Sequence, residues 1–277
     1  MAPGWELAGA FGTGLAVGAV SAVAGIGGGV LMVPFLYLVY HGTPVSLSAQ
    51  TVVAHATSLG VAFLASSIGT WRYAREQAIV WNVALAYAVP GIATAYLTAR
   101  VLTRSEQTVW LRGAFGIFLL VSAADMLRRA ERPAAEERDH PTPPHSPSWL
   151  VASGAVGGVM ASLLGIGGGL IAVPVLLYIG RLPIRAVAPT ALAGVCLTTL
   201  AGALGYALAG PAPPVSWAMA GYVDLRMTVP LALGAALTVP LGVRINRGAR
   251  PRRLYWIFAV LLGTIGVSLL WSWLRAG

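Results

Sequence analysis

The sequence predicts an all-α membrane protein that crosses the bilayer several times and is built from two homologous, inverted helical repeats. Three observations predict this fold class. The 277 residues are 57% hydrophobic and only 10% charged, whereas about a quarter of the residues in a soluble domain are charged. No Lys, Arg, Asp or Glu occurs from Leu7 to Trp71, although one transmembrane helix needs only about 20 apolar residues. Finally, a glycine-rich motif and its apolar surroundings occur twice.

The first half of the chain contains five apolar segments, near residues 7–24, 30–41, 46–70, 78–99 and 109–127. We expect each to be helical, because a membrane barrel would show alternating strands of about ten residues. No positive residue precedes the first segment, so we expect a retained helix there and not a signal peptide. The first two segments measure about 27 Å and 18 Å as helices. They are therefore either two tilted crossings or two part-way helices that meet at the glycines.

A charged, proline-rich stretch separates the two halves and is expected to be a linker outside the bilayer. Apolar segments then recur near residues 148–164, 170–180, 186–209, 224–243 and 254–274. The predicted organisation is a first transmembrane repeat at 1–127, a polar linker at 128–148 and a second transmembrane repeat at 149–277.

The two halves match each other at a nearly constant offset. Gly18 corresponds to Gly158 at an offset of 140, and the two glycine-rich motifs keep this offset. Thr51 corresponds to Thr190 after one deletion. Internal duplication of a helical membrane unit is typical of secondary transporters.

The distribution of arginine predicts how the two halves face. All 18 positively charged residues are arginines. If each half crosses the membrane an odd number of times, 13 arginines lie on one side and 5 on the other, whereas parallel repeats would give 10 and 8. Because positive residues accumulate in cytoplasmic loops, we expect inverted repeats in the inner membrane of the cell, with a cytoplasmic linker and both termini outside.

The motif Gly-Ile-Gly-Gly-Gly occurs at residues 25–29 and again at 165–169. It matches neither a dinucleotide-binding loop, which needs Gly or Ala at the sixth position, nor a phosphate loop, which needs lysine. Two interpretations remain. The glycines either bring helices into close contact, or they break a helix and present the N–H groups of a new helix start to an anion.

The glycine motifs, each followed by apolar residues and a proline, resemble those of the sulfite exporter TauE/SafE family. The stretch AHATSL at 54–59 matches a family element in full, but Cys196 and Leu197 depart from it in the second half. A later family element is present as GYVDLR at 221–226 and only weakly as AIVWN at 78–82. The resemblance implies transport of sulfite, sulfoacetate or related organosulfur anions, often outward.

We predict a substrate site formed by both glycine motifs and by one threonine from each half. The threonine hydroxyls either donate to one bound oxyanion or bond back to their own helix. The candidate substrate-binding residues are Gly25, Gly27, Gly28, Gly29, Thr51, Gly165, Gly167, Gly168, Gly169 and Thr190.

Three further polar residues lie within or beside the apolar segments. His55 follows Thr51 by one helical turn and is a candidate for proton coupling, because histidine titrates near neutral pH; the alternative is a buried core histidine. Asp224 and Arg226 open a predicted helix, where a carboxylate ordinarily complements the helix dipole. A role in transport is the alternative for this pair.

The sequence therefore predicts a secondary transporter of a small anion, such as a sulfite, sulfonate or carboxylate ion, with an anion channel as the alternative. An inside-negative potential favours export by about 2.3 kcal/mol per charge and 100 mV. The sequence has no basic stripe with interleaved aromatic residues, so we expect no nucleic-acid partner. We also expect no metal, cofactor or catalytic group. The expected partners are the anionic substrate and the lipid bilayer. The oligomeric state stays open, with a homodimer as one option.

Overall fold

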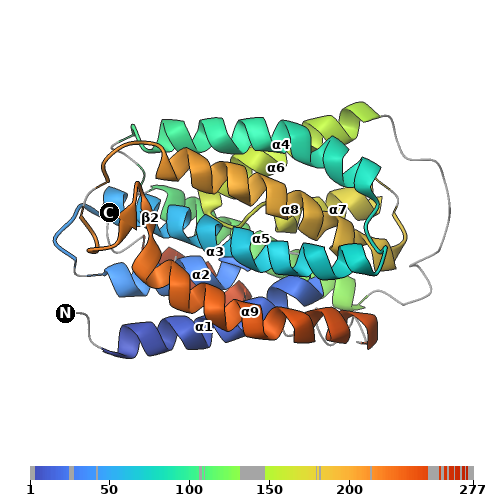
Figure 1. Ribbon diagram of the computed structural model, residues 1–277, viewed down its shortest axis with the longest axis horizontal. Helices are drawn as coiled ribbons and strands as arrows, with labels where there is room; N and C mark the ends of the chain where they lie inside the picture. Colours follow the sequence, from blue (N-terminus) through green and yellow to red (C-terminus); the bar gives the residue numbers. More distant parts are fainter. Residues whose placement is uncertain are drawn as a thin grey trace.

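The computed structural model describes residues 4–24, 28–41, 43–105, 108, 110–131, 147–178, 180, 182–212, 214–248 and, in short pieces, 256–273. Nearly all of these residues are helical, and the helices lie side by side along the long axis of the molecule (Figure 1). Five of the described helices are long and apolar enough to cross a membrane: Gly4–Val23, Leu47–Arg75, Trp81–Leu102, Arg185–Ala207 and Leu225–Ile245. The prediction of an all-α, multi-pass membrane protein is confirmed.

The helices of the first half are α1 (Gly4–Ala24), α2 (Gly29–Tyr40), α3 (Leu47–Arg75), α4 (Trp81–Leu102) and α5 (Trp110–Glu131). Those of the second half are α6 (Pro147–Leu164), α7 (Gly169–Tyr178), α8 (Ile184–Ala207) and α9 (Leu225–Gly248), with the short strands β1 (Met219–Ala220) and β2 (Val223–Asp224) before α9. Further helical residues are described within 256–273. Ser46 begins α3 as its N-cap, because its side chain accepts a hydrogen bond from the Ala49 N–H at 3.2 Å.

Helices α3, α5 and α6 extend beyond the limits that hydrophobicity predicted. Helix α5 continues to Glu131 and α6 begins at Pro147, so both enter the stretch 128–148 that we assigned to the linker. Helix α3 likewise continues from the apolar segment to Arg75. Alanine, arginine and glutamate are strong helix formers, so these helices continue through polar residues after their apolar segments end.

Helices α2 and α7 are too short to cross a bilayer. They contain 12 and 10 residues, which correspond to about 18 Å and 15 Å, against about 30 Å for the hydrocarbon core. The last residue of α2, Tyr40, contacts Asp224 at the end of the molecule where α1 and α9 begin. Helix α2 therefore runs back toward the end at which α1 starts.

Helices of the first half pack against helices of the second half. Figure 1 shows α1 beside α9 on one side of the molecule and α4 beside α6 on the other. The contacts are close because glycine lies at each: a Cβ atom on Gly18 would lie 2.2 Å from the Ala235 carbonyl oxygen, and one on Gly158 would lie 2.2 Å from the Gly91 carbonyl oxygen. The two halves therefore interlock and do not form separate bodies.

Helices α3 and α8 cross in the centre and run in opposite directions. Ser67 contacts Cys196 at 3.3 Å, while Leu59, earlier in α3, lies beside Gly202, later in α8. The central pair carries most of the buried polar side chains that the structure describes, among them Gln50, Thr51, His55, Thr57, Ser58, Ser66, Thr190, Thr198 and Thr199. Opposite directions of matching helices are what an inverted repeat requires, and they support that prediction.

Candidate functional site

Each glycine motif lies in the sequence between the end of one helix and the start of a short one. Helix α1 ends at Ala24 and α2 begins at Gly29, while α6 ends at Leu164 and α7 begins at Gly169. Of the predicted site residues, Gly25 and Gly27 lie outside the residues that the structure describes. The other glycines of both motifs are buried.

The glycines before α2 and α7 have the same left-handed backbone conformation. The φ angle is 76° at Gly28 and 74° at Gly168, and it is also positive at Gly165 and Gly167. Residues with a Cβ atom adopt this conformation only with strain, whereas glycine does so readily. The tight turn before α7 therefore explains the glycines of the second motif, and the backbone at Gly28 explains that glycine of the first.

The two turns touch each other inside the molecule. A Cβ atom on Gly29 would lie 2.3 Å from the Gly165 carbonyl oxygen and 2.5 Å from the Ile166 Cα atom. The start of α2 is thus in direct backbone contact with the turn that precedes α7. We call this region the glycine junction, and it comprises Gly28, Gly29 and Gly165–Gly169.

The glycine junction brings two helix N-termini into one buried place. The first N–H groups of a helix have no partner within that helix, and each N-terminus has the effect of about half a positive charge. Two such ends close together favour a bound anion, and irregular backbone at this depth is typical of binding sites in transporters.

Three side-chain hydroxyls hold carbonyl oxygens of the second turn. Ser58 on α3 donates to Gly165 at 2.7 Å. Tyr87 on α4 lies 3.5 Å from the Gly168 carbonyl oxygen. The Thr198 hydroxyl on α8 lies 3.4 Å from the Gly167 carbonyl oxygen, although the Val195 carbonyl oxygen of its own helix is closer at 3.1 Å. These bonds occupy partial negative charges that would repel an anion. Among the described residues no group of three or more His, Cys, Asp or Glu could hold a metal ion.

Sequence reasoning did not place Tyr87, Thr198 or Ser58 in the site. Of the three, only Ser58 stands out in the sequence, because it belongs to the AHATSL stretch that resembles a family element. Tyr87 and Thr198 reach the turn from helices that are distant from it in the sequence. Only tertiary packing shows their contacts.

The two predicted threonines are buried and bonded to backbone atoms. The Thr51 hydroxyl donates to the Leu47 carbonyl oxygen at 2.8 Å, which is the bond back to its own helix. The Thr190 hydroxyl accepts a hydrogen bond from the Val80 N–H at 3.1 Å, at the start of α4. Their role as donors to an anion stays a prediction.

His55 lies beside the glycine junction, but its ring faces aromatic residues. A Cβ atom on Gly165 would lie 2.9 Å from the His55 Cα atom. The imidazole Nε2 is 2.5 Å from the Tyr37 hydroxyl, and the ring centroid is 6.4 Å from that of Phe115. These contacts fit a buried core histidine, and proton coupling through His55 stays a prediction.

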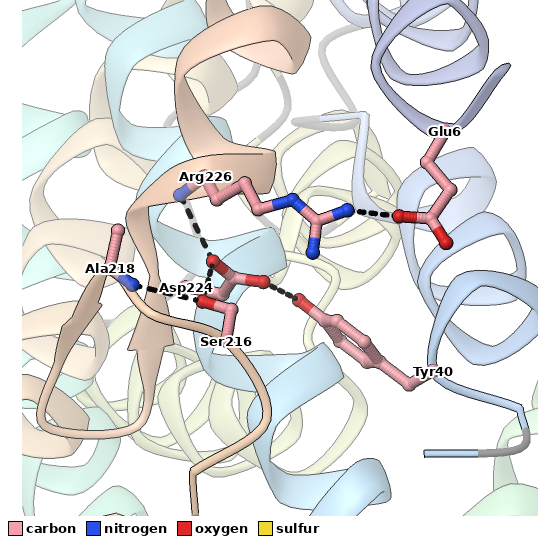
Figure 2. A network of polar contacts seen from close by, with 6 residues as sticks. All are labelled: Glu6, Tyr40, Ser216, Ala218, Asp224 and Arg226. Atoms are coloured by element: carbon pink, nitrogen blue, oxygen red, sulfur yellow. Dashed lines mark hydrogen bonds and ion pairs between the residues drawn. The ribbon is translucent and has the colours of Figure 1, made fainter. Parts of the chain in front are cut away.

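A second polar cluster surrounds Asp224, which is only 1% exposed (Figure 2). Its carboxylate accepts hydrogen bonds from the Ser216 hydroxyl at 2.7 Å, the Arg226 backbone N–H at 3.0 Å and the Tyr40 hydroxyl at 3.0 Å. The Arg226 guanidinium turns away and pairs with Glu6 at the start of α1. The sequence suggested ordinary charges at a helix start, whereas the structure shows a network that connects α1, α2 and α9, buried at Asp224 and Tyr40 and partly exposed at Glu6 and Arg226.

Comparisons with known proteins extend over almost the whole chain. The family model described as sulfite exporter TauE/SafE matches residues 10–269. A protein of Methanocaldococcus jannaschii described as a "Probable membrane transporter protein" is 26% identical over 259 residues, covering 93% of this chain and 92% of the relative. The "Probable membrane transporter protein YunE" of Bacillus subtilis is 26% identical over 275 residues, covering 94% and 95%. No solved structure matches this chain.

Proposed function

The chain belongs to the sulfite exporter TauE/SafE family and is a multi-pass membrane transporter, not an enzyme; from this premise we propose that it exports a small oxoanion. The resemblance that the glycine motifs suggested is thereby confirmed. The proposed substrates are sulfite, an organosulfur or sulfonate anion, or a related carboxylate. The proposed location is the inner membrane, where an inside-negative potential drives anions outward.

The glycine junction is the observation that carries this proposal. The N-termini of α2 and α7 come from different halves of the chain, yet Gly29 and Gly165 are in backbone contact. Together the two helix ends supply the effect of about one positive charge, although no Lys or Arg belongs to either motif. A small anion is the ligand that such a site favours.

The interlocked halves support a carrier mechanism. Each half contributes one short helix to the junction, and the two matching helix pairs α1–α9 and α4–α6 lie on opposite sides of it. Rocking of the side that holds α1 and α9 against the side that holds α4 and α6 would change which end of the junction is open, as in other transporters with inverted repeats. Direct backbone contact at the junction favours this alternation over a permanently open channel.

Efflux from proteoliposomes tests the proposed function. The purified chain is reconstituted into vesicles loaded with labelled sulfite, a sulfonate or a carboxylate, and an inside-negative potential is imposed. We expect saturable efflux of at least one oxoanion and none from protein-free vesicles. Non-saturating conductance would identify a channel, and the absence of flux for every anion would contradict the proposal.

A further inference from the structure

The connections before α4 and α9 differ between the halves. Residues 76–80 link α3 to α4, whereas the longer stretch 208–224 links α8 to α9 and contains the antiparallel pair β1–β2. We call residues 214–224 the cap segment. The shorter connection has no described strand, so one end of the bundle has a feature that the other end lacks.

The cap segment packs on the end of α8 through backbone contacts. The Tyr222 N–H donates to the Tyr206 carbonyl oxygen at 3.3 Å. Gly221 has a φ angle of 54°, and a Cβ atom there would lie 2.2 Å from the Ala207 carbonyl oxygen. The segment is therefore seated tightly on this end of the bundle.

Strand β2 also reaches into the bundle beside the glycine junction. The Asp224 N–H donates to the Thr57 hydroxyl oxygen at 3.0 Å, and Thr57 lies ten residues, or about 15 Å, beyond the start of α3. The next residue, Ser58, donates to Gly165 in the junction. Consecutive residues of α3 thus contact the cap segment and the proposed anion site.

The Asp224 carboxylate connects the cap segment to α2. Two of its donors, the Ser216 hydroxyl and the Arg226 N–H, are near it in the sequence, in the cap segment and at the start of α9. The third donor, the Tyr40 hydroxyl, belongs to α2 (Figure 2). Breaking the Tyr40 bond therefore separates the cap segment from α2 while the buried carboxylate keeps two partners.

We propose that the cap segment is a gate over one end of the anion path and that the Tyr40–Asp224 hydrogen bond is the latch that holds it closed. Tyr40 is the last residue of α2, and the first residue of that helix, Gly29, lies in the junction. Helix α2 thus connects the junction directly to the latch. If α2 shifts when an anion enters or leaves the junction, Tyr40 shifts with it. This proposal rests on the proposed function only for the chemical class of the ligand that passes the gate.

Thiol labelling tests the gate without any anion. Val223 in the cap segment is 5% exposed, so Val223→Cys in a Cys196→Ala background, which removes the native thiol, provides a probe that reacts when the gate opens. Tyr40→Phe should speed labelling about tenfold, because it removes a hydrogen bond to a charged group. The matched control is Tyr73→Phe, which removes a buried hydroxyl bonded to Ala22 near the opposite end of α3; it should change the rate less than twofold.

A double-mutant cycle identifies the latch partner. Asp224→Val introduces the residue type of Val80, which immediately precedes α4 in the other half. In that background Tyr40→Phe should add less than twofold to the labelling rate, because the shared bond is already absent. If the cap segment does not open, the parent and Tyr40→Phe chains should be labelled at equal rates. If Tyr40→Phe has the same effect with and without Asp224→Val, the two residues are not partners. Either result overturns the proposal.

Two readouts separate a failed gate from a failed function. Thermal unfolding of each variant checks that the labelled chains are folded, and Ser216→Ala supplies a second variant that weakens the same carboxylate network. Anion efflux is measured on the same preparations. Faster labelling of Tyr40→Phe without flux of any anion would support the gate and contradict only the proposed substrate class.

Discussion

Ser58 gives the sharpest test of the site at the scale of single residues. Its hydroxyl, donating at 2.7 Å, holds the Gly165 carbonyl oxygen, so the turn keeps its shape and this oxygen is occupied. The glycines themselves are less informative targets. An alanine at Gly168 would need a φ angle of 74° and would place its Cβ 2.9 Å from the Gly157 carbonyl oxygen, so strain and lost binding would be measured together.

We expect Ser58→Ala to weaken anion binding about tenfold, because an unpaired carbonyl oxygen would then face the junction. The measurement is equilibrium binding of the transported anion to purified protein. Ser58→Thr should restore most of the affinity. Ser66→Ala, which removes a buried hydroxyl bonded to Phe63 in the same helix, should bind like the parent. Equal affinity of Ser58→Ala and Ser66→Ala would remove Ser58 from the site.

At the scale of elements, the paired helices depend on backbone contact. Thr94 donates across the α4–α6 interface to the Ala155 carbonyl oxygen at 2.8 Å, and Thr238 donates across the α1–α9 interface to the Leu15 carbonyl oxygen at 2.6 Å. Each bond lies next to a glycine at which a Cβ atom would collide with the partner helix. The two interfaces therefore use the same combination of glycine and threonine.

Gly158→Ala should lower the free energy of unfolding by about 1–3 kcal/mol, the range for overpacking. The carbonyl oxygen 2.2 Å from the added Cβ belongs to backbone and cannot move away alone. Gly12→Ala is the matched control: nothing lies within 4 Å of its Cβ position, and alanine favours a helix over glycine by roughly 0.5–1 kcal/mol. Thermal unfolding in detergent measures both. Equal stability of the two variants would show that the interface does not need glycine.

At the scale of the whole molecule, helix directions place the cap segment and the linker at opposite ends. Helix α8 reaches the cap segment with its last turn. Helices α4 and α8 run in the same direction, as do α4 and α6. In each pair, residues later in one helix contact residues later in the other. The start of α6 therefore lies at the end opposite to the cap segment. With the arginine distribution, this predicts a cytoplasmic linker and an external cap segment.

A membrane-impermeant thiol reagent tests this orientation in intact cells. Trp217 in the cap segment is 87% exposed, and Ser148 at the start of α6 is also exposed. In the Cys196→Ala background, Trp217→Cys should react from outside, whereas Ser148→Cys should react only after permeabilisation. Reaction of both from the same side would contradict the predicted topology.

The sequence alone determined the fold class and the places where helices break. Long uncharged segments must be helical in a bilayer, because the backbone has no other partner there, and the glycine motifs coincide with the turns before α2 and α7. Both are local effects, so they are visible in short windows of sequence. Hydrophobicity was less informative about helix ends, because polar residues such as those before Glu131 continue a helix as readily as apolar ones.

Only the tertiary structure decided which elements meet. It brought Gly29 against Gly165, joined Asp224 to Tyr40 and Thr57, and showed that α1 packs on α9. No local pattern encodes these contacts, because each depends on how helices from different halves are placed in three dimensions. Asp224 was visible in the sequence as one carboxylate before a helix, but the three donors to this buried group come from α2, the cap segment and α9.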